Sequence, residues 1–202
     1  MEHDRLTRLA VRPPALTTFD LKSAGPCRAR RPKHPGGHIK DHVATTQSLL
    51  DRADVIDVLT RYATSIDLRR WSDFAGCLAD EVEISMPVTA GWVPMSREDL
   101  VGLASRIYAQ LEATQHISGN HQVTVDGDQA TALSTLNATH YLGEDVDGGS
   151  LQREIGYYEW RLVRSDHGWT IDRMHMTISW VEGNTPHFRR IQATADMPSA
   201  TA

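Results

Sequence analysis

The segment Arg61-Tyr62-Ala63-Thr64-Ser65-Ile66-Asp67-Leu68-Arg69-Arg70-Trp71 closes the first helical pattern of the chain. The pattern consists of apolar residues that recur at spacings of three and four, namely Ile56, Leu59, Ala63 and Ile66. This spacing predicts an amphipathic helix over about 49–68. Asp67 lies four residues after Ala63, so at about 100° per residue its carboxylate falls within about 40° of the apolar stripe. We therefore expect Asp67 to point inward, although a helix-end hydrogen bond to the chain near Trp71 would account for it equally well.

Further helices and strands follow from periodicity and turn residues. A short helix is expected over 71–78, a strand over 81–86, a loop over 86–95, and a helix capped by Ser96 that runs to about Leu111. Beyond Thr114 the pattern changes to four long strands with turn signals between them, over 117–125, 129–142, 151–164 and 169–181. Helices followed by a meander predict an α+β fold, in which a curved sheet, mixed or antiparallel, wraps around the N-terminal helices.

Charge divides the chain into parts. Residues 1–42 hold nine Lys and Arg against four Asp and Glu, whereas the whole chain of 202 residues carries a net charge of −5. The basic stretch has no sustained apolar period, so we expect residues 1–42 to form a disordered N-terminal extension. Translation from an upstream start codon could be the origin of this extension. One globular domain is expected over 43–184 and a C-terminal tail over 185–202.

Composition argues against several classes of protein. The chain after residue 42 is acidic, which makes it unsuited to binding nucleic acid. No run reaches the ~18 apolar residues that are needed to cross a bilayer. Because the N-terminus lacks an apolar secretory stretch, we expect a soluble, cytoplasmic protein. Cys27 and Cys77 do not suggest a disulfide framework, and no glycine-rich dinucleotide motif follows a strand. We expect neither a metal nor a cofactor, because no compact ligand spacing occurs among His116, His121, His140 and His175.

The expected partner of Asp67 is a histidine in the segment Thr114-Gln115-His116-Ile117-Ser118-Gly119-Asn120. An imidazole that a carboxylate holds in one tautomer is a general base, which needs no metal to abstract a proton. Alternation along 130–142 places His140 on the inner face of its strand, and alternation along 156–162 places Tyr158 there. A buried histidine is nevertheless more often a hydrogen-bonded core residue than a catalyst.

Three groups of segments together resemble the SnoaL-like proteins of the nuclear-transport-factor-2-like superfamily, in the branch similar to scytalone dehydratase and lindane dehydrochlorinase. They are 61–71; Thr114-Gln115-His116 with Asn120 and 125–130; and Gly156-Tyr157-Tyr158 with 162–164 and 168–171. The resemblance covers about 46–184 and implies a cone-shaped α+β barrel that often pairs through its sheet, here into a homodimer or homotrimer. It also implies that Asp67 orients His116 and that His140 is a second pocket histidine.

On this basis we expect a cofactor-independent lyase or isomerase, namely a dehydratase, a double-bond isomerase or an aldol-type cyclase. Its substrate would be a small apolar cyclic ketone or a polyketide-like molecule. The expected catalytic residues are Asp67, His116 and, as electrophilic helper, His140. The expected substrate-binding residues are Tyr62, Trp71, Met86, Trp92, Asn120, Leu136, Tyr158 and Trp180. The alternative is a non-catalytic small-molecule-binding or assembly module on the same fold.

Overall fold

The computed structural model describes residues 46–89, 91–144 and 146–195. The expected basic extension over 1–42 lies outside the described residues, so its disorder stays a prediction. The described elements are α1 (Thr46–Asp67), α2 (Trp71–Ala75), β1 (Leu78–Ser85), β2 (Val93–Ser96), α3 (Arg97–Tyr108), β3 (Ala113–Asp126), β4 (Gln129–Tyr141), β5 (Leu151–Ser165), β6 (Gly168–Gly183) and α4 (Thr185–Thr194). Helices followed by long strands confirm the expected α+β class.

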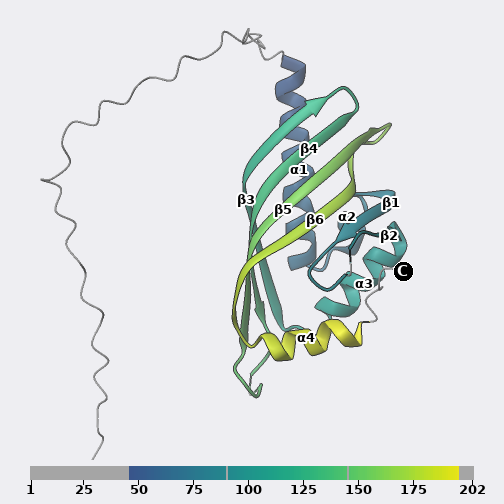
Figure 1. Cartoon of the computed structure of the whole chain (residues 1–202). Helices are drawn as coiled ribbons and strands as arrows, with labels where there is room; N and C mark the ends of the chain where they lie inside the picture. The colour runs from purple at the N-terminus through teal and green to yellow at the C-terminus, as the bar shows by residue number, and fades with distance from the viewer. Residues whose placement is uncertain (1–45, 90, 145, 196–202) are drawn as a thin grey trace, which may run out of the picture. The chain divides into compact units, whose positions relative to one another are not determined.

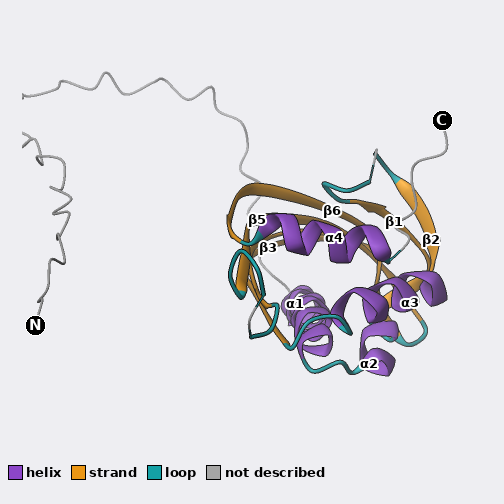
Figure 2. Cartoon of the chain, turned by 90° about the horizontal axis from the view of Figure 1, so that it is seen from below, coloured by secondary structure: helices purple, strands orange, loops and turns teal. Residues whose placement is uncertain are grey.

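Six strands form one sheet in the order β2-β1-β6-β5-β4-β3. β1 pairs in parallel with β6, and all other neighbouring strands in this sheet are antiparallel. The sheet is therefore mixed, and Figure 1 shows that it curves without closing. Figure 2 shows the strands arching over α1, α3 and α4, which occupy the concave side. Along β4 every second residue from Ala130 to His140 is buried, as the sequence alternation predicted.

The helices are held in place by buried apolar residues and by hydrogen bonds near their ends. α1 buries Val55, Leu59 and Ile66 on the side that faces the sheet. Arg52, in the first two turns of α1, donates from Nη1 to the Val123 carbonyl at 2.8 Å, which fastens the helix along the edge strand β3. α3 begins where expected, because the Ser96 hydroxyl accepts a hydrogen bond from the Asp99 amide at 3.1 Å and caps the helix.

Three local expectations need correction. The loop expected over 86–95 contains the start of β2, a short edge strand interrupted by Pro94, which weakens its strand signal. α2 ends at Ala75 rather than at residue 78, because Gly76 ends the helix and Leu78 already pairs in β1. The segment expected to be a C-terminal tail forms α4 over Thr185–Thr194.

α4 is anchored through its first turn. The Asn184 side chain accepts a hydrogen bond from the His187 amide and donates to the carbonyls of Asp147 and Gly149, at 2.9 and 2.8 Å. Phe188 and Ile191 are buried against the domain. Asn184 therefore ties α4 to the β4–β5 connection, and the helix lies across one end of the concave side (Figure 2).

Within the described residues, no helix is both long and apolar enough to cross a membrane.

Candidate active site

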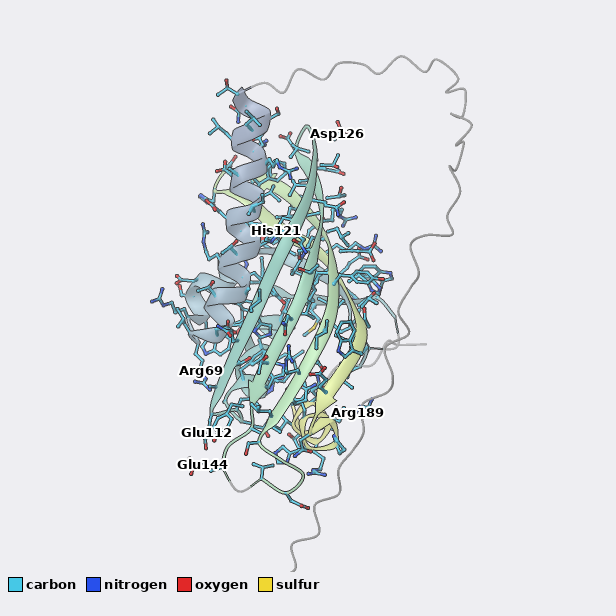
Figure 3. All side chains as sticks on the ribbon, turned by 90° about the vertical axis from the view of Figure 1, so that its left-hand side faces the viewer. Arg69, Glu112, His121, Asp126, Glu144 and Arg189 are labelled. Carbon is cyan, nitrogen blue, oxygen red and sulfur yellow. The ribbon has the colours of Figure 1, made fainter. Side chains whose placement is uncertain are left out.

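The end of α1 is fastened to the start of β3 by Arg69. This residue has a left-handed backbone, with φ +54°, and its guanidinium donates to the carbonyls of Tyr108, Leu111 and Glu112. Figure 3 shows Arg69 and Glu112 at one end of the sheet, with His121 and Asp126 toward the other. Asp67, two residues before Arg69, is thereby held beside β3.

Asp67 and His116 form the pair that the sequence suggested. One carboxylate oxygen, Oδ1, lies 2.6 Å from the ring Nδ1 of His116, and the other accepts the His116 backbone N–H at 2.8 Å. The two side chains are 17% and 5% exposed, so water competes little for these contacts. Because an ionised carboxylate can only accept, Nδ1 carries the proton and Nε2 carries the free lone pair. The arrangement fixes both the position and the tautomer of the imidazole.

Tyr108, the last residue of α3, contacts the free nitrogen. Its hydroxyl oxygen lies 3.2 Å from Nε2 of His116. Burial raises the pKa of Tyr108 well above its ordinary value, so the hydroxyl stays protonated and donates to Nε2. Sequence reasoning missed this residue, although Leu100, Ala104 and Tyr108 recur every four residues along the buried stripe of α3.

His116 borders a cavity with a narrow inner part, and a wider outer part lies beside it. The inner part, about 60 Å³, is lined by His116 and Tyr108 and by residues of α1, β4, β5 and β6, among them Tyr62, Ala138, Glu154 and Tyr158. The outer part, about 490 Å³, lies between α4, β6 and the segment after β1. Both parts share the lining residues Val88, Glu154, Met176, Phe188 and Gln192, so the two lie next to each other.

The expected substrate-binding residues divide between this cavity and other places. Tyr62, Met86 and Tyr158 line the inner part. Leu136 is only 2% exposed and lies in the core, where it lines neither part. Trp71 packs edge-on against Phe74, with ring centres 6.2 Å apart, and is likewise absent from the lining.

Trp92, Asn120 and Trp180 also lie outside the cavity. Trp92 packs under the guanidinium of Arg173, 3.9 Å from its ring centre, at a separate surface hollow that His175 also lines. Asn120 is exposed, with φ +52°, at an irregularity of β3 between Gly119 and Gln122. Trp180 is 53% exposed because an extra β6 residue opposite Ile155 and Gly156 shifts the alternation, which turns Val181 toward the cavity instead.

His140 is sealed from the cavity. It is 1% exposed, its Nδ1 lies 2.9 Å from the Thr114 hydroxyl, and Phe188 of α4 stacks on its ring at 4.4 Å. Burial, with the neighbouring His116, lowers the pKa of His140 to about 3, so its ring is neutral near pH 7. It lines neither part of the cavity, and the expected contact of His140 with a substrate oxygen is therefore corrected to a packing contact beside His116.

In the part of the chain that the structure describes, no group of three or more His, Cys, Asp or Glu side chains is placed to hold a metal ion.

Fold and cavity together define a class of α+β protein, in which an open curved sheet surrounds a pocket with an Asp–His pair. The sequence model of the SnoaL-like domain matches residues 47–175, more than half of the chain, so the chain belongs to the SnoaL-like family. α4 lies beyond the matched residues. No curated protein matches the sequence.

Solved structures with the same fold include proteins of the branch suggested by the sequence. The Kfla4162 protein from Kribbella flavida is 26% identical, with a TM-score of 0.66 over 71% of this chain and 99% of that one. A protein assigned provisionally as a scytalone dehydratase from Novosphingobium aromaticivorans is 16% identical, with a TM-score of 0.60 over 67% and 89%. Hexachlorocyclohexane dehydrochlorinase LinA-type3 from Novosphingobium barchaimii is 16% identical, with a TM-score of 0.59 over 68% and 92%. The last two likenesses show the fold alone.

Proposed function

We propose that this protein is a cofactor-independent lyase or isomerase in which His116 removes a proton from a carbon next to a carbonyl group. The observation that carries the proposal is the double contact of Asp67 with the backbone and ring of His116, which leaves Nε2 as the basic nitrogen at the inner cavity. Membership of the SnoaL-like family, and the likeness to a dehydrochlorinase and to a provisionally assigned dehydratase, support this class of reaction.

Charge changes during proton abstraction suit the surroundings of His116. As Nε2 accepts a proton, the ring becomes an imidazolium, which the Asp67 carboxylate stabilises. The substrate carbon gives up its hydrogen, and negative charge develops on the carbonyl oxygen. A substrate carbon at Nε2 of His116 takes the place of the Tyr108 hydroxyl there, which frees that hydroxyl to donate to the carbonyl oxygen, with Tyr158 as a second donor. Burial raises the pKa of both tyrosines, so both hydroxyls stay protonated. General-base catalysis of this kind contributes roughly 10²–10⁴-fold in rate.

Cavity size and lining indicate the substrate class. The outer part has the volume of a small-molecule site, and its walls are largely apolar, with Val88, Met176, Ile178 and Phe188 among them. The inner part has room only for the reacting end of a molecule. We therefore propose a small, largely apolar cyclic ketone or a polyketide-like ketone, with its carbonyl end toward His116.

The proposal is tested by exchange of hydrogen for deuterium. Cyclohexanone and tetralone are incubated with the protein in D₂O, and loss of the proton next to the carbonyl is followed by NMR. The wild-type protein is expected to catalyse exchange, and His116→Gln to lose it by about 10²-fold or more while its melting temperature stays close to wild type. His167→Gln, in the exposed turn between β5 and β6, is the matched control. Binding of these ketones without exchange would support the alternative of a non-catalytic binding module.

A further inference from the structure

Glu154 of β5 lies across the sheet from His116. Ala138 of β4 pairs with His116 on one side and with Glu154 on the other, so the three residues form one row across β3, β4 and β5. With neighbouring strands about 4.8 Å apart, the Cα atoms of His116 and Glu154 lie about 10 Å apart. All three residues line the inner cavity. The Ala138 side chain is only a methyl group, which leaves space between the base and the carboxyl for a reacting molecule.

Glu154 also has the surroundings of a proton donor. Burial raises its pKa, and the side chain of Gln152 on the same strand, with attraction to His116 and to Arg189 of α4, only partly offsets this. The other titratable groups that influence it are the hydroxyls of Tyr108 on α3 and Tyr158 on its own strand, and both have raised pKa values. From β4 and β6 it meets the apolar Ala138 and Met176. A carboxyl group in such surroundings keeps its proton to higher pH than an exposed one.

Glu154 is the titratable residue that lines both parts of the cavity. The outer part, which Arg189 also lines, connects it to solvent. Figure 3 shows Arg189 at the same end of the sheet as Arg69 and Glu112. A proton lost by Glu154 inside the cavity can therefore be replaced from water in the outer part.

We propose that protonated Glu154 is the general acid of this site and that the protein dehydrates β-hydroxy ketones. The inference rests on the proposed function of His116 as the base. In this step Nε2 of His116 takes the proton from the carbon next to the carbonyl, and the electrons of that C–H bond form the new C=C bond. The bond from the neighbouring carbon to the hydroxyl oxygen breaks, and that oxygen receives the Glu154 proton and leaves as water.

The step leaves an imidazolium at His116 and a carboxylate at Glu154, with no change of oxidation state overall. Proton transfer from His116 to Glu154 through water in the cavity restores both groups. Elimination needs such an acid, because a hydroxyl group leaves readily only when it is protonated to water, and Glu154 faces His116 across the cavity, where it can supply that proton.

The experiment uses one probe with two readouts. The aldol adduct of benzaldehyde and acetone is a β-hydroxy ketone, and its dehydration to benzalacetone is followed by absorbance. Deuterium exchange next to its carbonyl, followed by NMR, reports proton abstraction alone. We expect Glu154→Gln, which keeps the size of the side chain, to retain exchange and to dehydrate the adduct about 10²-fold more slowly than wild type. Glu159→Gln, on the opposite face of the same strand, is the matched control and is expected to retain both.

The pH dependence adds a readout that a structural role would not change. In the wild-type protein dehydration is expected to decline as pH rises through the pKa of Glu154, and Glu154→Gln is expected to lack that decline. Dehydration by Glu154→Gln at the wild-type rate would overturn the inference. Exchange without dehydration by the wild-type protein would overturn it too, and would leave the proposed function intact. If the wild-type protein neither exchanged nor dehydrated the adduct, both the inference and the proposed function would be overturned.

Discussion

His116 and His140 lie on neighbouring strands, with ring centres 5.6 Å apart, yet their surroundings differ. His116 has a carboxylate at Nδ1 and, at the cavity wall, the Tyr108 hydroxyl at Nε2, whereas His140 has the Thr114 hydroxyl at Nδ1 and an aromatic ring over its face. The two inward-facing histidines of this sheet thus have different surroundings. The carboxylate fixes the tautomer that the proposed base needs, whereas burial keeps His140 uncharged.

The neutral state of His140 predicts a pH dependence of stability. Its pKa is about 3 in the folded protein and about 6.5 in an unfolded chain, so the unfolded state binds more protons between these values. The free energy of unfolding should therefore decrease as pH falls below about 6.5, with this residue contributing up to about 1.4 kcal/mol per pH unit. Urea denaturation of wild type and His140→Leu at a series of pH values measures the difference.

The substituted protein is expected to lose stability less steeply than wild type as pH falls. His167→Leu, in an exposed turn, is the control and should keep the wild-type slope. Equal slopes for wild type and His140→Leu would contradict the buried, neutral state of the ring.

At the residue scale, the direction of a side chain can be predicted from the sequence where the helix or strand that carries it is regular. Asp67 and His116 lie on a regular helix and on the regular first half of a strand, so their directions follow from 3.6- and two-residue repeats. The alternation that placed Tyr158 inward also places Glu154 inward, since the two are four residues apart on β5. A charged residue near the end of a strand is nevertheless usually exposed, so Glu154 was not predicted as a site residue. Asn120 and Trp180 were expected in the cavity but lie outside it. Each is next to an irregularity in strand pairing, in β3 and in β6, which changes the direction in which the side chains point.

At the scale of elements, the irregular pairing of β5 with β6 shapes the cavity. Gly156 lies where β6 approaches most closely, and a Cβ atom built there would lie 1.9 Å from the Thr177 carbonyl oxygen. No such contact is sterically allowed, so any side chain at this position forces the two backbones apart. The extra β6 residue opposite Ile155 and Gly156 also turns Val181 of β6 toward the outer part of the cavity.

Gly156→Ala is therefore expected to destabilise the protein by about 1–3 kcal/mol, measured by chemical denaturation. Gly119→Ala on β3 is the matched control, because its Cβ would meet only the Thr135 hydroxyl at 3.6 Å, an ordinary contact. If the two variants were equally stable, the close approach of β5 and β6 would be wrong.

β2 and α4 were not predicted because each carries a weak local signal. Four residues with a proline do not show strand alternation, and α4 has only Phe188 and Ile191 as buried helical positions. Both elements depend on partners distant in sequence, namely β1 for β2 and the β4–β5 connection for α4. The long strands and α1 were predictable because each repeats its pattern over several turns or residue pairs.

At the scale of the whole molecule, the outer face of the sheet carries exposed apolar side chains. Ile117 is 55% exposed and Tyr157 38%, and both lie opposite inward-facing neighbours, His116 and Tyr158. Exposed apolar side chains mark protein–protein contacts where they form a continuous patch, and single ones are ordinary. The expected homodimer or homotrimer stays a prediction, and light scattering after gel filtration tests it. A dimer or trimer is expected for wild type and a smaller species for Tyr157→Asp, whereas a wild-type monomer would contradict the prediction.

Asp67 holds His116 with a protonated Nδ1, which leaves Nε2 as the basic nitrogen. Nitrogen-15 NMR of the histidine rings tests this claim directly, because protonated and unprotonated ring nitrogens have different shifts. We expect neutral His116 to show a protonated Nδ1 in the wild-type protein, and Asp67→Asn to show a mixture of tautomers or a flipped ring. A proton on Nε2 of neutral His116 in the wild-type protein would contradict the account.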